Sequence, residues 1–160
     1  EYAGWSMSFF DAEVGAHIGK QIAANDMLLL GRRTYESFEA TFGSMSGPQA
    51  DGMNNFKKYV VSTTMGTPTW NNTTLISGNV VEEVRKLKAE DGGNIGVSGS
   101  GTLLQTLMQA NLVDEFSLLV YPMVLGKGKK LFNDYHADFT LVEARPLSTG
   151  VVIMTYALKG

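Results

Sequence analysis

The sequence contains no cysteine among its 160 residues. Disulfide bridges, thiolate zinc sites and cysteine nucleophiles are therefore excluded for this chain. Histidine is nearly as scarce, because only His17 and His136 are present. The two histidines stand far apart, and neither has carboxylates around it at the spacing of metal ligands. We therefore expect neither a disulfide framework nor a metal site.

Long apolar runs and an excess of positive charge are also missing. No apolar run approaches the roughly 18 residues that a membrane-spanning helix needs, and the first residues show no signal-peptide pattern. The formal net charge is −3, which argues against the basic face of a general nucleic-acid binder. We expect a soluble, cytoplasmic protein that acts on a small molecule and binds neither nucleic acid nor a membrane.

The residues that are present suit one globular domain. Hydrophobic residues make up 44% of the 160 positions, enough for a sizeable core. The 18 glycines exceed average usage, so tight turns or close approaches of the backbone should be frequent. No internal repeat or linker composition interrupts the chain. We expect residues 1–160 to form a single domain.

The apolar periodicity predicts strands that alternate with helices as far as residue 121. The expected helices span residues 11–25, 32–42, 79–92 and 102–111. The expected strands span residues 26–31, 57–63, 73–77, 94–99 and 115–126, followed by an antiparallel pair at 138–145 and 150–158. Residues 43–56 have the composition of a surface loop. This order predicts an α/β fold with a mainly parallel sheet, helices on both faces and antiparallel C-terminal strands.

One strand-to-helix corner has the residues of an anion site. In an open α/β sheet, ligands bind beyond the carboxyl ends of the strands, where loops enter helix N-termini. Gly31 ends a strand there, and Arg32, Arg33 and Thr34 form the first helical turn. The unpaired amides of that turn carry about half a positive charge, to which two guanidinium groups add. Phosphate is the natural partner, although arginines in a first turn are often merely solvated.

Two other strand ends are similar in character. Ser62, Thr63 and Thr64 offer three hydroxyl groups, and residues 99–102, Gly-Ser-Gly-Thr, leave backbone amides free to face a diphosphate. Ordinary turn chemistry explains either segment equally well. The glycine-rich corner also lacks a G-x-G-x-x-G motif, because position 104 is leucine, and it lacks the lysine of a P-loop. Three such corners on one sheet edge favour a phosphate site more than any one alone.

Four segments together resemble a known family: "LLLGRRTYESF", "KYVVSTT", "GVSGSGTLLQTLMQANLVDEFSLLVYPMVLGKGKKLF" and "STGVVIMTY". They resemble the dihydrofolate-reductase-like superfamily, and most of all the C-terminal reductase domain of bifunctional riboflavin-biosynthesis deaminase/reductases. The resemblance runs over essentially the whole chain, in order. It implies a dihydrofolate-reductase-like three-layer α/β fold, with a mainly parallel central sheet, antiparallel C-terminal strands and flanking helices.

The resemblance also implies NADPH binding along the carboxyl edge of the sheet. Phosphates would be held by Gly31, Arg32, Arg33 and Thr34, and the adenosine end would be lined by Ser62, Thr63 and Thr64. The pyrophosphate would be cradled by Gly99, Ser100, Gly101, Thr102 and Leu103. The implied activity is the NADPH-dependent reduction of a small pyrimidine- or pterin-like heterocycle, similar to 5-amino-6-(5-phosphoribosylamino)uracil reductase. A homodimer is also implied.

The sequence departs from the family pattern at three places. Ser98 stands where riboflavin-pathway reductases carry a glutamate. Asp11 lies near the position of the catalytic acid of folate reductases, but its place before a helix favours a capping role. Family members also open with a strand ending in Ser-Leu-Asp-Gly, for which the residues before Trp5 have no counterpart, so we expect that the first strand is missing from the sequence. Alternative functions are dihydrofolate reductase and a non-catalytic, dimeric nucleotide-binding module.

Overall fold

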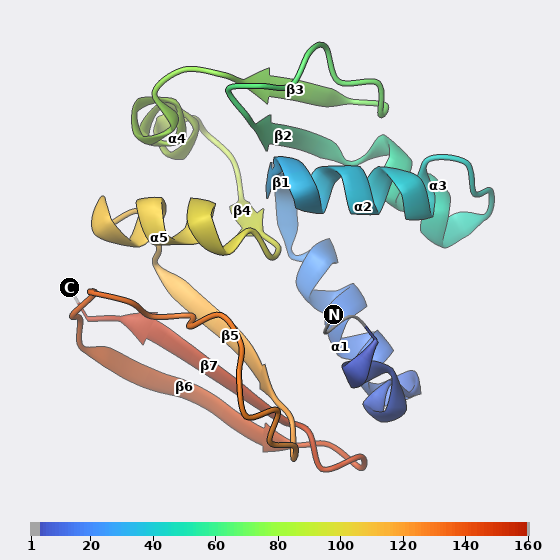
Figure 1. Cartoon of the computed structure of the whole chain (residues 1–160), viewed down its shortest axis with the longest axis vertical. Coiled ribbons are helices and arrows are strands. Elements are labelled where there is room, and N and C mark those ends of the chain that lie inside the picture. The colour runs from blue at the N-terminus through green and yellow to red at the C-terminus, as the bar shows by residue number, and fades with distance from the viewer. Residues whose placement is uncertain (1–3, 160) are drawn as a thin grey trace. The chain divides into compact units, whose positions relative to one another are not determined.

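The computed structural model describes residues 4–159 and has helices and strands in the order drawn in Figure 1. The chain divides into two compact units. One unit comprises residues 23–112, and the other comprises residues 1–22 together with residues 113–160. The strands of the first unit are parallel and those of the second are antiparallel.

The first unit is built on a four-stranded parallel sheet with the strand order β3-β2-β1-β4. The strands are β1 (Asn25–Gly31), β2 (Lys57–Val61), β3 (Thr73–Ile76) and β4 (Asn94–Val97). β1 lies inside the sheet and pairs with both β2 and β4. Its residues Met27 to Leu30 are all buried, which explains why this segment is continuously apolar rather than alternating.

Four helices accompany this sheet: α2 (Arg32–Phe42), α3 (Pro48–Asn55), α4 (Val80–Ala89) and α5 (Gly101–Gln109). α2 contacts β1 and β2, and α5 contacts β1. α4 begins as its sequence predicts, because the side chain of Asn79 accepts a hydrogen bond from the amide of Glu82. α4 ends at Ala89, so the helix expected over residues 79–92 was three residues too long at its C-terminal end.

α3 lies within residues 43–56, where the sequence predicted only a loop, so that prediction was wrong. Its sequence, PQADGMNN, has little helix propensity, and packing stabilises it instead: Ala50 and Met53 are buried. The fully buried ammonium of Lys58 donates hydrogen bonds to the carbonyl oxygens of Met53, Asn54 and Phe56, at 2.9, 3.1 and 2.7 Å. A cation placed on the last carbonyls of a helix stabilises that end.

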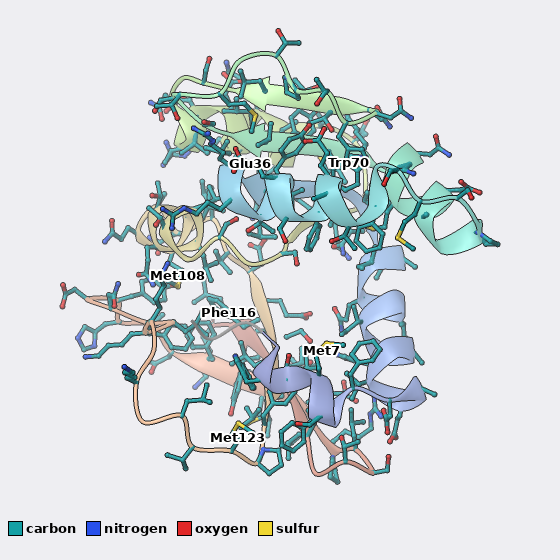
Figure 2. The ribbon with its side chains drawn as sticks, turned by 45° about the vertical axis from the view of Figure 1, so that its right-hand side comes forward. Met7, Glu36, Trp70, Met108, Phe116 and Met123 are labelled. Atoms are coloured by element: carbon teal, nitrogen blue, oxygen red, sulfur yellow. The ribbon has the colours of Figure 1, made fainter. Side chains whose placement is uncertain are left out.

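The surroundings of Lys58 are apolar on the other side. Its Nζ atom lies 4.3 Å from the centre of the ring of Trp70, a residue labelled in Figure 2. Trp70 itself packs against Tyr35 of α2. Burial lowers the pKa of Lys58 to about 8. The three carbonyl acceptors and the ring face favour the charged form and so act against this shift.

The second unit contains an antiparallel sheet of the order β5-β7-β6. Its elements are the short 3-10 helix η1 (Trp5–Phe9), α1 (Ala12–Ala23), β5 (Glu115–Val120), β6 (Phe139–Pro146) and β7 (Val152–Leu158). β5 ends at Val120, whereas the strand was expected to span residues 115–126; Pro122 has no amide to donate, and the pairing stops before it. Val14 of α1 is fully buried in a cluster with Leu147, Val151 and Ile153.

The fold class expected from the sequence is confirmed: parallel strands, antiparallel C-terminal strands and flanking helices make a mixed α/β fold. The antiparallel strands form a sheet of their own rather than an edge of the parallel sheet. The expectation of a single domain stays a prediction. Within residues 4–159, no helix has both the length and the apolar character that crossing a membrane requires.

His17 of α1 is a buried titratable group, only 6% exposed. Its Nε2 atom has no hydrogen-bond partner in the described part of the chain, so a proton added there would remain unpaired. Burial lowers the pKa of His17 below its usual value of 6.5; Arg145 and Lys20 act in the same direction, and Glu143 opposes them. The folded chain therefore resists protonation of this histidine.

We expect the stability of the protein to fall between pH 7 and pH 5 because of His17. In this range the unfolded chain takes up a proton on His17 that the folded chain takes up less readily, so the free energy of unfolding decreases as the pH falls. Urea denaturation at several pH values measures this slope. His17→Gln should flatten the slope, whereas the matched change at the exposed His136, His136→Gln, should leave it unchanged. Equal slopes for wild type and His17→Gln would contradict the assignment.

Candidate functional site

The three corners expected to bind phosphate lie at one edge of the parallel sheet, all within residues 23–112. β1, β2 and β4 run in the same direction, and Gly31 at the end of β1 pairs with Val61 at the end of β2. Val97, the last residue of β4, pairs with Leu29 of β1. The loops after these strands therefore leave from the same edge, where ligands of open α/β sheets bind.

The first and third corners are joined directly by Ser100. The amide of Gly31 donates a hydrogen bond of 2.7 Å to the Oγ atom of Ser100. The hydroxyl groups of Thr34 and Ser100 are hydrogen-bonded at 2.9 Å. A Cβ atom at Gly31 would lie 2.6 Å from Ser100 Oγ, so only glycine permits this approach. This corner has small residues partly because the side chain of Ser100 already fills the space beside Gly31.

The first and second corners are joined by Arg32. Its Nη1 atom donates a hydrogen bond of 2.8 Å to the hydroxyl of Thr64. Its Nε atom lies 2.7 Å from the carboxylate of Glu36, one turn further along α2 (Figure 2). Arg33 is exposed and makes no recorded ion pair within residues 4–159. Glu36 was not singled out from the sequence, although its spacing of four residues from Arg32 was a usable signal.

The N-termini of α2 and α5 lack the polar side chains that usually pair with the first amides of a helix. Neither helix has a side-chain cap or an acidic residue in its first turn. The other α-helices of the described chain differ: α1 and α4 have both features, and α3 has Asp51 in its first turn. The first amides of α2 and α5 therefore keep their positive potential at the edge described above. Such ends suit an anionic group, and a dinucleotide's phosphates are of this kind.

The other predicted residues take different positions at this edge. Ser62 is buried, and its hydroxyl accepts hydrogen bonds from the amides of Thr64 and Met65, so it shapes the turn after β2. The side chain of Leu103 is buried in the core. The remaining members of the predicted set at the second and third corners are exposed: Thr63, Thr64, Gly99, Gly101 and Thr102. Ser98 follows β4 directly and is half-buried.

Asp11, the candidate catalytic residue, belongs to the other unit and lies before α1. One carboxylate oxygen accepts a 2.8 Å hydrogen bond from the amide of Val14, and the other accepts one of 3.0 Å from the hydroxyl of Ser148. The hydrogen bond from Val14 lowers the pKa of Asp11, and Ser148 adds to this effect. These contacts are those of a helix cap held in its ionised form, whereas a general acid needs a raised pKa. A catalytic role stays a prediction.

Comparisons with known proteins agree with this fold. The model of the RibD C-terminal domain family matches residues 3–153 of the chain. The uncharacterized protein YyaP of Bacillus subtilis (strain 168) is 34% identical over an alignment of 142 positions, which covers 84% of this chain and 75% of that protein.

Solved structures share the same fold at lower identity. A protein of Shewanella sp. PV-4 named for riboflavin biosynthesis superposes with a TM-score of 0.72 at 22% identity, over 94% of this chain and 81% of that one. A pyrimidine reductase-like protein of Corynebacterium diphtheriae has a TM-score of 0.70 at 12% identity, over 100% of this chain and 86% of the other.

We expect Gly31→Ala to destabilise the chain by about 1–3 kcal/mol, the usual effect of overpacking. The added Cβ would force Ser100 to rotate away and give up its hydrogen bonds to Gly31 and Thr34. Gly101→Ala is the matched control, because a Cβ there meets nothing within 4 Å. Urea denaturation compares the two variants with wild type. Equal stability of the two variants would show that the approach of Gly31 and Ser100 is not tight.

The contacts of Asp11 predict how its variants unfold. Asp11→Ala should lower the melting temperature by about 3 °C, the shift typical of a lost helix cap in a chain of this size. Asp11→Asn should retain most of the wild-type value, because asparagine also accepts the capping hydrogen bond. Circular dichroism on heating provides the measurement. If Asp11→Ala melted at the same temperature as wild type, Asp11 would not stabilise α1 as a cap.

Proposed function

The chain belongs to the RibD C-terminal domain family, and on this premise we propose that it is an NADPH-dependent reductase of a small pyrimidine- or pterin-like heterocycle. The family supports an oxidoreductase of the pyrimidine-reductase type that uses a nicotinamide cofactor. NADPH in particular, and a reaction similar to that of 5-amino-6-(5-phosphoribosylamino)uracil reductase, are our proposals.

One observation supports this function above the others: two uncapped helix N-termini and Arg32 meet at the carboxyl edge of the parallel sheet. Amides, hydroxyl groups and a guanidinium are supplied there by three segments, Gly31–Thr34, Thr63–Thr64 and Gly99–Thr102. This set of donors fits a ligand that carries several phosphoryl groups, because phosphoryl oxygens accept hydrogen bonds and carry negative charge.

The residues at this edge would bind and orient the cofactor. The first amides of α2 and α5 face the pyrophosphate in this proposal, and the hydroxyl of Thr34 in α2 is hydrogen-bonded to Ser100, the residue before α5. The nicotinamide, when bound, supplies the hydride. The protein's own contribution is then to hold the dinucleotide by its phosphates, so that its reactive ring has one fixed position.

Arg32 is the residue most suited to distinguish NADPH from NADH. Its guanidinium is held at both ends, by Glu36 through Nε and by Thr64 through Nη1. An arginine fixed in this way leaves its remaining N–H groups oriented for a second acceptor. A 2′-phosphate beside this pair would accept hydrogen bonds from the remaining N–H groups of Arg32 and from the hydroxyl of Thr64, whereas NADH has no phosphate at that position.

The substrate class follows from the relatives. A pyrimidine reductase-like protein is among the solved structures with this fold, which supports a pyrimidine as the heterocycle. Ser98 has no carboxylate with which to anchor a ribosylaminopyrimidine, so a substrate other than that of the riboflavin pathway also suits the site. The expected homodimer and the expected cytoplasmic location stay predictions.

We expect wild-type protein to bind NADPH more tightly than NADH, and Arg32→Ala to weaken NADPH binding about 10- to 100-fold, the effect of losing charge-assisted hydrogen bonds. NADH binding should weaken at most a few-fold, because NADH lacks the 2′-phosphate. Titration of the fluorescence of each reduced cofactor gives both dissociation constants. Turnover is then followed as NADPH oxidation with aminopyrimidine and dihydropterin substrates.

The control variant is Arg85→Ala, since Arg85 is an exposed arginine of α4 that also pairs with a glutamate of its own helix. This variant should bind both cofactors as wild type does. Equal losses of NADPH and NADH affinity in Arg32→Ala would contradict the 2′-phosphate assignment. Tight binding without turnover of any substrate would support a non-catalytic nucleotide-binding module instead. No binding of either cofactor by wild type would overturn the proposed function.

A further inference from the structure

The hydroxyl of Ser100 points into the protein rather than toward a ligand. Ser100 is the residue before the first turn of α5, where a serine commonly caps its own helix. Here it makes no such bond. Its Oγ atom contacts the amide of Gly31 and the hydroxyl of Thr34 instead, at 2.7 and 2.9 Å. Ser100 therefore acts on the neighbouring corner.

The backbone at Ser100 would accommodate glycine more easily. Ser100 has φ 60° and ψ 60°, in the left-handed region, and Gly99 before it has φ 64°. A residue with a Cβ atom is strained in this conformation, whereas glycine adopts it freely. Serine, unlike glycine, has a hydroxyl group, which forms the hydrogen bonds to Gly31 and Thr34.

The hydrogen bonds at this contact allow the hydroxyl of Ser100 to be the donor to Thr34. The amide of Gly31 can only donate, so it uses one lone pair of Ser100 Oγ. The hydrogen of the Ser100 hydroxyl remains, and Thr34 Oγ1 lies within reach as an acceptor. When Ser100 donates to Thr34, the hydrogen of the Thr34 hydroxyl is left to point elsewhere. Two hydroxyl groups and one amide then form a chain in which every donor but the last is used.

Thr34 is well placed to use that last hydrogen. It lies in the first turn of α2, beside the uncapped amides, and is half-buried. A Cβ atom at Gly99 would lie 3.2 Å from Thr34 Oγ1, so the glycine leaves the space beside this hydroxyl open. A phosphoryl oxygen can only accept hydrogen bonds, so it would complete the chain.

We infer, on the basis of the proposed dinucleotide function, that Ser100 is a positioning residue that holds the hydroxyl of Thr34 as a donor toward a phosphoryl oxygen. Ser100 itself does not touch the phosphate. The chain Gly31 N–H to Ser100 O–H to Thr34 O–H to phosphate makes the contribution of Ser100 depend on Thr34. Replacement of either residue removes the same contact with the ligand.

A double-mutant cycle tests this dependence. Ser100→Gly keeps the left-handed backbone without the hydroxyl, and Thr34→Val removes the other hydroxyl at nearly constant volume. Each single variant should weaken binding of NADPH, and of inorganic pyrophosphate as a simpler probe, by about tenfold. The double variant should also lose about tenfold rather than about a hundredfold. Thr34→Ser keeps the donor and should stay within about twofold of wild type.

Isothermal titration calorimetry measures both ligands, and circular dichroism verifies that each variant is folded. Ser100→Ala is the second variant, to be used if Ser100→Gly loosens the corner. The inference would be overturned if the double variant lost about a hundredfold in affinity, or if a Ser100 variant bound as wild type does. In either case, NADPH binding by wild type would leave the proposed function standing. If wild type binds pyrophosphate but not NADPH, the proposed function fails. The double-mutant cycle measured with pyrophosphate then tests the inference by itself. Binding of neither ligand overturns both.

Discussion

The hydrogen bond from the amide of Gly31 to the hydroxyl of Ser100 connects the ends of β1 and β4, and the candidate site depends on it. It requires that position 31 have no side chain, because a Cβ atom there would occupy the place of the Ser100 oxygen. It also requires a left-handed backbone at Ser100. With this contact formed, the N-termini of α2 and α5 lie at the same edge of the sheet, and in the proposed function their unpaired amides bind one ligand rather than two.

The positive potential at this edge comes from few charged groups. The chain has a net charge of −3, yet acidic residues are absent from the first turns of the two helices that begin there. Glu36 is the nearest exception, and it neutralises no amide, because it lies one turn away and pairs with Arg32. The same carboxylate holds the guanidinium against Thr64. A positive potential therefore arises locally in an acidic chain, from backbone dipoles and one oriented arginine.

Strand β2 shows how the fold supports the site from a distance. At its start, Lys58 places a buried ammonium on the last carbonyls of α3, and at its end Ser62 shapes the turn that carries Thr63 and Thr64. The sequence revealed neither role. A lysine in a predicted strand is ordinarily exposed, and the carbonyls that make its burial possible belong to a helix with little propensity of its own.

The sequence by itself determined the helices and strands of the described chain other than η1 and α3, because apolar periodicity reports how each element is buried. It also determined the residue types at the three corners. It also indicated the capping position of Asp11, which depends only on neighbours along the chain. Tertiary structure alone decided that α3 is a helix, that Ser100 turns its hydroxyl to Gly31 and Thr34, and that Arg32 reaches Thr64. These contacts join residues about 30 to 70 positions apart, and hydrogen bonds across such distances follow from the register of parallel strands, which no local pattern encodes.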